Sequence, residues 1–91
     1  NLDYELLLAD TSEEIRSQYR NKVLGTLTDE EKELLQVYFA KDMSLQDTSE
    51  ALFIHKNSLQ YKLNRIAERS GYNPRKFTDA VVLYSALKLL V

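Results

Sequence analysis

The side chains with the clearest capacity for chemistry lie between residues 56 and 65. Lys56, Asn57 and Gln60 combine one cation with two carboxamides. A carboxamide offers a donor and an acceptor together, which matches the major-groove edge of adenine, and Lys can contact guanine or phosphate. We therefore predict that these three side chains contact bases of double-stranded DNA.

A second group of side chains suits the phosphate backbone, because hydroxyls and long cations can hold a phosphate oxygen without reading a base. The predicted phosphate contacts are Ser44, Ser58, Tyr61, Lys62 and Arg65. Some of these residues have a local alternative. Asn57 and Ser58 are both favoured at a helix N-terminus, and Tyr61 is also expected as a half-buried core or dimer-interface aromatic. His55 is interpreted as a helix cap or turn residue.

Residues 44–63 have the pattern of two short helices joined by a tight turn. Small Ser49 stands where two such helices cross, and Leu52 and Ile54 flank the turn. In the second helix, predicted at about 56–70 and ending at Gly71, Leu59, Leu63 and Ile66 share one face. Burial of that face would hold the polar face outward, as in a helix-turn-helix unit.

The rest of the chain is also typical of helices. Two Gly and one Pro, with many Leu, Glu, Lys, Ala and Gln, predict an all-α fold. We expect a small helical bundle of about five to six helices that contains the helix-turn-helix unit. Thr28 and Glu31 form a capping-box pattern at the start of one helix. Its expected buried face is Leu34, Leu35, Tyr38 and Phe39.

The two ends of the chain are expected to add further helices. Four leucines (2, 6, 7 and 8) suggest a short first helix, and Thr11 with Glu14 suggests a second capping box. The helix that follows is expected to end at Gly25 as its C′ residue, and its apolar stripe is Ile15, Tyr19, Val23 and Leu24. Asn73 is expected to be the N-cap of the last helix, and Pro74 its first helical residue. The face predicted to be buried in the last helix is Phe77, Ala80, Val81, Tyr84, Leu87 and Leu90. Residues 1–27 are predicted to pack on, or lead into, a domain of residues 28–91.

The charge of the chain changes sign near His55. Residues 1–54 hold 5 Lys/Arg and 12 Asp/Glu, a net charge of −7, whereas residues 55–91 hold 7 and 2, a net charge of +5. Such asymmetry points to a polyanionic partner. Two complementary faces within one domain, or an acidic surface that aids solubility, are the structural alternatives.

Several classes of function are disfavoured. The chain has no cysteine and one histidine, so no metal site or cofactor is expected. Neither a nucleophile–base pair nor a Gly-rich phosphate loop is present, which argues against an enzyme. No apolar run is long enough for a membrane span, so we expect a cytoplasmic protein. A protein-interaction or dimerisation module with a degenerate helix-turn-helix, and a Fis-like DNA-binding domain, are the alternatives.

Residues 52–63, LFIHKNSLQYKL, resemble a family signature. It belongs to the C-terminal helix-turn-helix domain of PucR/CdaR-type bacterial transcriptional regulators and reads roughly Leu-Phe-Val/Ile-His-Arg-Asn-Thr-Leu-Arg-Tyr-Arg-Leu. The resemblance covers residues 28–91 and implies DNA as the partner and a sensory or GGDEF-like region N-terminal to the domain. We also expect the full-length protein to act as a homodimer on a repeated or palindromic site. Lys56 and Lys62 stand where the family usually has Arg. They keep the charge but lose the planar fork, which bears on the choice of bases.

Overall fold

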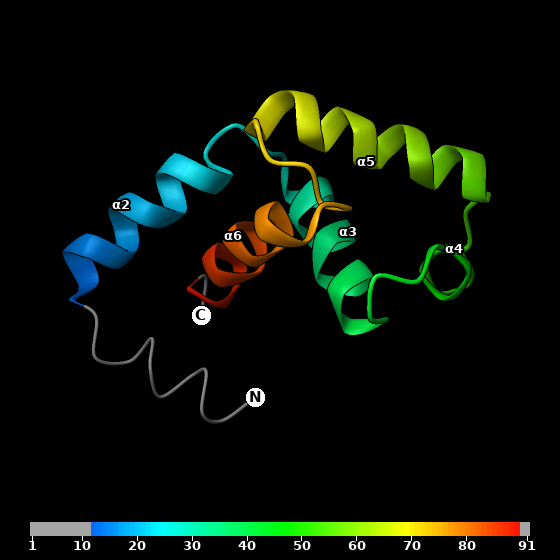
Figure 1. Cartoon of the computed structure of the whole chain (residues 1–91), viewed down its shortest axis with the longest axis horizontal. Helices are drawn as coiled ribbons and strands as arrows, with labels where there is room; N and C mark the ends of the chain where they lie inside the picture. Colours follow the sequence, from blue (N-terminus) through cyan, green and yellow to red (C-terminus); the bar gives the residue numbers. More distant parts are fainter. Residues whose placement is uncertain (1–11, 90–91) are drawn as a thin grey trace.

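The computed structural model describes residues 12–89, which form five α-helices and no strand (Figure 1). The helices are α2 (Glu13–Leu24), α3 (Asp29–Ala40), α4 (Leu45–Leu52), α5 (Lys56–Ser70) and α6 (Phe77–Lys88). The predicted all-α bundle is confirmed. The helix expected at Leu2, Leu6, Leu7 and Leu8 lies outside the described residues, as does Leu90.

One apolar core holds the five helices together. Leu35, Leu59, Leu63, Ile66 and Leu83 are completely buried in it, so the face predicted for α5 is confirmed. Complete burial of a side chain of this size contributes roughly 1.5–3 kcal/mol to folding. Helix α2 packs on α6, α3 packs on both α4 and α6, and α4 packs on α5. The end of α2 belongs to the same core through Val23 and Leu24.

Capping residues fix where α2 and α3 begin. At α3 the predicted capping box is present: the Glu31 N–H donates to Thr28 Oγ1 at 3.1 Å, and the Thr28 N–H donates to Glu31 Oε1 at 2.9 Å. For α2 the N-cap is Ser12, one residue after the predicted Thr11, which lies outside the described residues. Arg20 donates to Glu13 in the first turn of α2 and thereby lowers the pKa of that carboxyl group.

The two glycines end their helices differently. Gly71 closes α5 with φ of 82°, a left-handed conformation that glycine adopts at little cost. Gly25 closes α2 but keeps right-handed helical angles, with φ of −61°, so it is not the left-handed C′ residue that we expected. Its N–H donates to the Asn21 carbonyl at 3.0 Å, which continues the helical bonding by one residue.

The predicted start of the last helix is wrong. Asn73 and Pro74 form a turn, in which the Lys76 N–H donates to the Asn73 carbonyl and the Arg75 N–H donates to Asn73 Oδ1, both at 3.0 Å. Helix α6 therefore begins only at Phe77. The Asn73 side chain satisfies this turn rather than the helix, a role that suits Asn equally well.

The predicted buried face of α6 is also partly wrong. Phe77 is 75% exposed and Val81 43% exposed, whereas Leu83 and Ala86, which we did not expect inside, are fully buried. Residues 77–87 are apolar on nearly all sides, so periodicity alone does not select the inner stripe. Contact with α2 and α3 selects it. Ile15 in α2 is likewise 58% exposed rather than buried.

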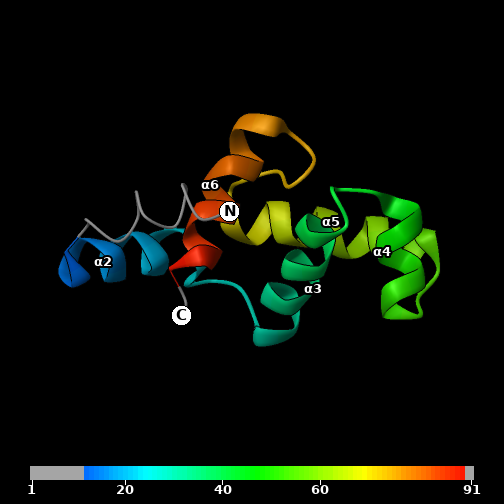
Figure 2. The same ribbon diagram turned by 90° about the horizontal axis from the view of Figure 1, so that it is seen from below.

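Helix α5 lies along one side of the bundle. In Figure 1 it runs along the upper edge, with α4 below its N-terminal end and α3 and α6 below the remainder. Figure 2, seen from below, shows α3 and α4 in front of α5. The outer side of α5 therefore faces away from the core.

Candidate nucleic-acid interface

Helices α4 and α5 form the predicted helix-turn-helix unit. Ser49 is 5% exposed, and its hydroxyl donates to the Gln46 carbonyl at 2.9 Å, which satisfies it within α4. Leu52 and Ile54, on either side of the turn, pack against the core. A small residue inside and two apolar anchors at the corner fix the angle between the helices, as the sequence indicated.

The turn itself has an unusual residue at its centre. Phe53 adopts φ of 56° and ψ of 40°, a left-handed conformation, and its side chain is 93% exposed. This conformation costs an L-residue roughly 1–2 kcal/mol. The strain allows the Ile54 N–H to donate to the Ser49 carbonyl at 3.0 Å, which ends α4 and turns the chain toward α5.

The N-terminal turn of α5 presents polar side chains to solvent. His55 is the N-cap, and the Asn57 N–H donates to His55 Nδ1 at 3.2 Å. Lys56, Asn57 and Ser58 are all exposed, whereas Gln60 is half-buried. No acidic residue lies in this turn, so the positive end of the helix dipole is not neutralised there by a carboxylate of α5.

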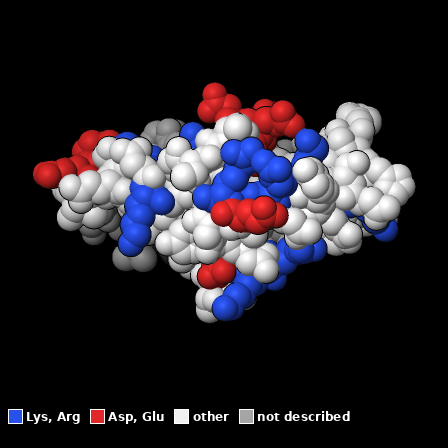
Figure 3. Space-filling model, turned by 90° about the horizontal axis from the view of Figure 1, so that it is seen from above, with Lys and Arg blue, Asp and Glu red and all other residues white. Residues whose placement is uncertain are grey.

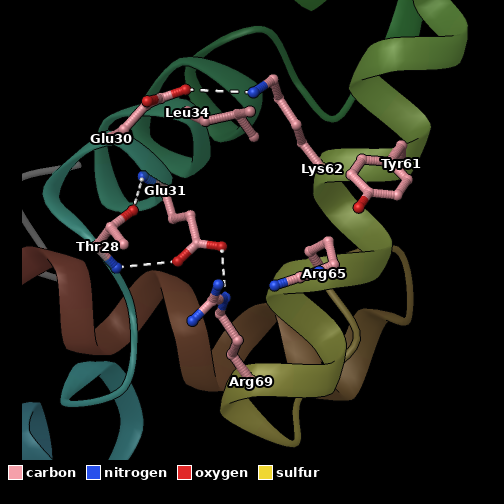
Figure 4. Close-up of a pocket in the computed structure, with 8 residues that line it drawn as sticks. All are labelled: Thr28, Glu30, Glu31, Leu34, Tyr61, Lys62, Arg65 and Arg69. Atoms are coloured by element: carbon pink, nitrogen blue, oxygen red, sulfur yellow. Dashed lines mark hydrogen bonds and ion pairs between the residues drawn. The ribbon is translucent and has the colours of Figure 1, made fainter.

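Most of the predicted phosphate contacts gather in a hollow of about 320 Å³ between α3 and α5 (Figure 4). Its lining residues are Thr28, Glu30, Glu31, Leu34, Tyr61, Lys62, Arg65 and Arg69. We call it the α3–α5 hollow. Tyr61 stands at its edge and is 62% exposed, more than the half-buried position that we expected.

Ion pairs cross the α3–α5 hollow. Lys62 Nζ lies 3.2 Å from Glu30 Oε1, and Arg69 Nε lies 3.3 Å from Glu31 Oε2. Arg65 points into the space between them (Figure 4) and has no hydrogen-bond or ion-pair partner among the described residues. Of the two predicted phosphate-binding cations, Arg65 is therefore available, whereas Lys62 is engaged by a carboxylate.

The opposite flank of α5 carries a contact that the sequence did not indicate. The guanidinium of Arg75, in the turn before α6, donates to Asn64 Oδ1 at 2.5 Å. Asn64 is exposed on the outer side of α5, so Arg75 adds a cation beside that face. The basic character of residues 55–91 was the only available signal, because α5 ends at Ser70, between the two residues, so no helical periodicity relates them.

Ser44 lies apart from the α3–α5 hollow, at the N-terminus of α4. Its hydroxyl accepts from the Asp47 N–H at 3.1 Å, so it caps the helix. Two functions are compatible at this position, because a capping hydroxyl keeps a proton to donate and the helix N-terminus favours anions.

Seen from the α5 side, the surface is mainly basic at its centre. Figure 3 shows Lys and Arg side chains gathered over the middle of this face, with acidic side chains among them and along one edge. The acidic residues in the first turn of α3 are Asp29, Glu30 and Glu31.

Within residues 12–89 no three His, Cys, Asp or Glu side chains are placed to hold a metal ion. Among the same residues, no helix is both long and apolar enough to cross a membrane.

Comparison with known proteins identifies the family. Residues 32–89 match the family model described as the PucR C-terminal helix-turn-helix domain. The chain is 46% identical over 55 residues to the carbohydrate diacid regulator of Escherichia coli, covering 60% of this chain and 14% of that protein. It is 29% identical over 80 residues to the proline-responsive transcriptional activator PutR of Bacillus subtilis, covering 80% of this chain and 20% of that protein.

A third relative, the uncharacterised YsfB of Bacillus subtilis, is 28% identical over 92 residues, covering 99% of this chain and 25% of that protein. The chain thus spans a quarter or less of the length of these relatives. No solved structure matches. The family match, the regulators among the relatives and the helix-turn-helix geometry support a DNA-binding, regulatory role. This chain belongs to the PucR C-terminal helix-turn-helix family.

Proposed function

We propose that this chain binds double-stranded DNA sequence-specifically, with α5 in the major groove, as the C-terminal module of a bacterial transcriptional regulator. The observation that carries the proposal is the first turn of α5. Its side chains Lys56 and Asn57 are exposed at an uncompensated helix N-terminus, while Leu59 and Leu63 fix the helix to the core. Residues at the start of a recognition helix normally reach deepest into the groove.

Base contacts and phosphate contacts are divided along α5 in this proposal. Lys56, Asn57 and Gln60 contact base edges, with Gln60 approaching from the flank because it is half-buried. Phosphate is contacted by Ser44, Ser58, Tyr61, Lys62 and Arg65. The α3–α5 hollow supports this division, because its unpaired Arg65 and exposed Tyr61 lie farther along α5 than the base-reading turn.

The oligomeric state that we propose follows from the way helix-turn-helix domains bind DNA. A single recognition helix reads only a few base pairs, so paired copies on a repeated or palindromic site give higher affinity and specificity. We propose a homodimer in the cytoplasm, with a sensory region preceding this domain in the whole protein. The residues matched make up only 14–25% of each of these relatives, whose greater length leaves room for such a region. The domain itself acts by binding and has no enzymatic role.

Fluorescence anisotropy with duplex DNA tests the division of contacts. Replacing Asn57 or Gln60 by Ala should reduce the discrimination between a preferred and an altered duplex by roughly 1–3 kcal/mol. Replacing Arg65 by Ala should weaken binding to all duplexes alike and reduce the dependence of log K on log salt by about one unit.

Ile15→Ala is the matched control, because Ile15 is an exposed residue of α2, away from this face. Absence of any duplex binding at low salt, even by a dimeric protein, would refute the proposed function. Uniform weakening by Asn57→Ala, with no change in preference, would refute the division alone.

A further inference from the structure

A second surface of the domain, on α3 and α6, is apolar and unoccupied by any described residue. The C-terminal end of α3 and the N-terminal half of α6 enclose a hollow of about 420 Å³. Its lining residues, which we call the α3–α6 surface, are Phe39, Asp42, Met43, Phe77, Ala80, Val81 and Tyr84. Phe77 is 75% exposed and Val81 43% exposed. These are the residues of α6 that the sequence pattern placed in a core.

The α3–α6 surface continues into a neighbouring hollow of about 280 Å³, which also reaches Leu87 and Lys88. Phe39 and Tyr84 separate the two hollows, and their rings meet edge to face with centroids 5.7 Å apart. The surface therefore has both projections and recesses. Phe77 protrudes from it, and the rings of Phe39 and Tyr84 form a ridge with a hollow on each side. Contiguous exposed apolar groups of this kind mark interaction sites, because their burial removes apolar area from water.

The charges around the α3–α6 surface restrict what can bind there. Asp42 lies at the end of α3 and Lys76 directly precedes Phe77 at the start of α6, so the two charges flank the hollow from different elements. Neither forms an ion pair with another described residue. A rim with both signs suits a contact with its own copy, because a two-fold axis that runs between these two charges would bring each Asp42 to the Lys76 of the other copy.

The position of the α3–α6 surface in the fold is also compatible with a second copy of this chain as the partner. Figure 2 shows the N-terminal half of α6 (orange) projecting beyond the edge of α5, and Figure 1 places the end of α3 on the side away from α5. Contacts made there leave the outer side of α5 uncovered in both copies. We propose that the α3–α6 surface is the contact through which two copies of this chain pair. It deepens the homodimer of the proposed function, but its test requires no DNA.

The size of the contact sets its expected strength. Seven lining residues fall short of the roughly 20 to 30 per partner in an interface of standard size, so the dimer of the 91-residue chain should be weak. Sedimentation of the 91-residue chain at concentrations up to about 1 mM should show a monomer–dimer equilibrium. Val81→Asp should raise the dissociation constant at least about tenfold, whereas Ile15→Asp, at an exposed aliphatic residue of α2, should leave it unchanged.

The absence of cysteine from the chain allows a direct test of location. Val81→Cys should give a covalent dimer with a short bismaleimide, and Ile15→Cys under the same conditions should not. Lys76→Glu and Asp42→Lys should each weaken the dimer, and the two together should restore it, because each reversed charge then again faces its opposite.

A monomer at all concentrations, with equal cross-linking at positions 81 and 15, would overturn the proposal and leave the apolar surface to a preceding part of a longer chain. A dimer that Val81→Asp does not disturb would also overturn it, by showing that pairing uses another surface. Neither result would touch DNA binding by α5, which the anisotropy measurements assess separately.

Discussion

At the scale of single residues, two positions in the helix-turn-helix unit have features that should affect stability or DNA binding. Phe53 holds a left-handed conformation with its ring in solvent, and Lys62 has its charge paired with Glu30. The sequence predicted the chemical types at the face, because Lys, Asn, Gln and Arg are recognisable there. It did not predict that Lys62 is paired while Arg65 is not, because that depends on α3, about 30 residues away in the chain.

Phe53→Gly should be more stable to unfolding than Phe53→Ala, by about 1 kcal/mol. Glycine relieves the left-handed strain, whereas alanine retains it, and the lost ring was almost entirely exposed. The order is the reverse of that at an ordinary helical site, where Ala is the more stable by a similar amount. Urea unfolding of the two variants measures the difference. Equal stabilities would show that residue 53 does not need the left-handed conformation.

Glu30→Gln should strengthen DNA binding up to about fivefold, since Lys62 would no longer be shared between a carboxylate and phosphate. Asp29→Asn is the matched control: it removes the same charge from the same helical turn, but Asp29 pairs with Lys32 of its own helix at 3.8 Å. Both are measured by anisotropy at one salt concentration. If the two variants improve binding equally, net charge rather than the Glu30–Lys62 contact is responsible.

At the scale of elements, the helices from 28 to 70 were predictable and α6 was less so. The Thr28 capping box and the four- and three-residue spacing of Leu59, Leu63 and Ile66 each admit one structural solution, and both are observed. In contrast, Asn73–Pro74 suits a helix start and a turn equally, and residues 77–87 are apolar nearly all round. Tertiary contact decides such cases. The left-handed residues Asp42, Met43 and Phe53 were also unforeseen, because no glycine marks them.

Ser44 offers a test of whether an N-cap also contacts phosphate. Ser44→Asp should keep the stability of the fold, because Asp caps α4 as well as Ser, but should weaken DNA binding by placing a carboxylate near phosphate. Ser44→Ala should lose about 1 kcal/mol of stability with the cap. Thermal unfolding and anisotropy together separate the two functions. Unchanged DNA affinity in Ser44→Asp would limit Ser44 to capping.

At the scale of the whole molecule, the change of charge along the chain has two structural consequences. Part of it is internal complementarity, because Glu30 and Glu31 of the acidic half pair with Lys62 and Arg69 of the basic half. The remainder faces outward on α5, where Lys and Arg side chains gather over the middle of one face (Figure 3). An average net charge of −2 conceals this separation. The α3–α6 surface lies away from that face, so the proposed pairing and the proposed DNA binding would use different sides of the molecule.

Selection of bound duplexes from a random pool tests the central claim most directly, which is that the first turn of α5 reads base sequence. The 91-residue chain should enrich a short motif, and in paired sites its copies should be spaced by about one helical turn of DNA, 10–10.5 base pairs. Asn57→Ala should enrich a motif that has lost preference at one position. Recovery of an unchanged motif by that variant, or of no motif by the original chain, would contradict the account.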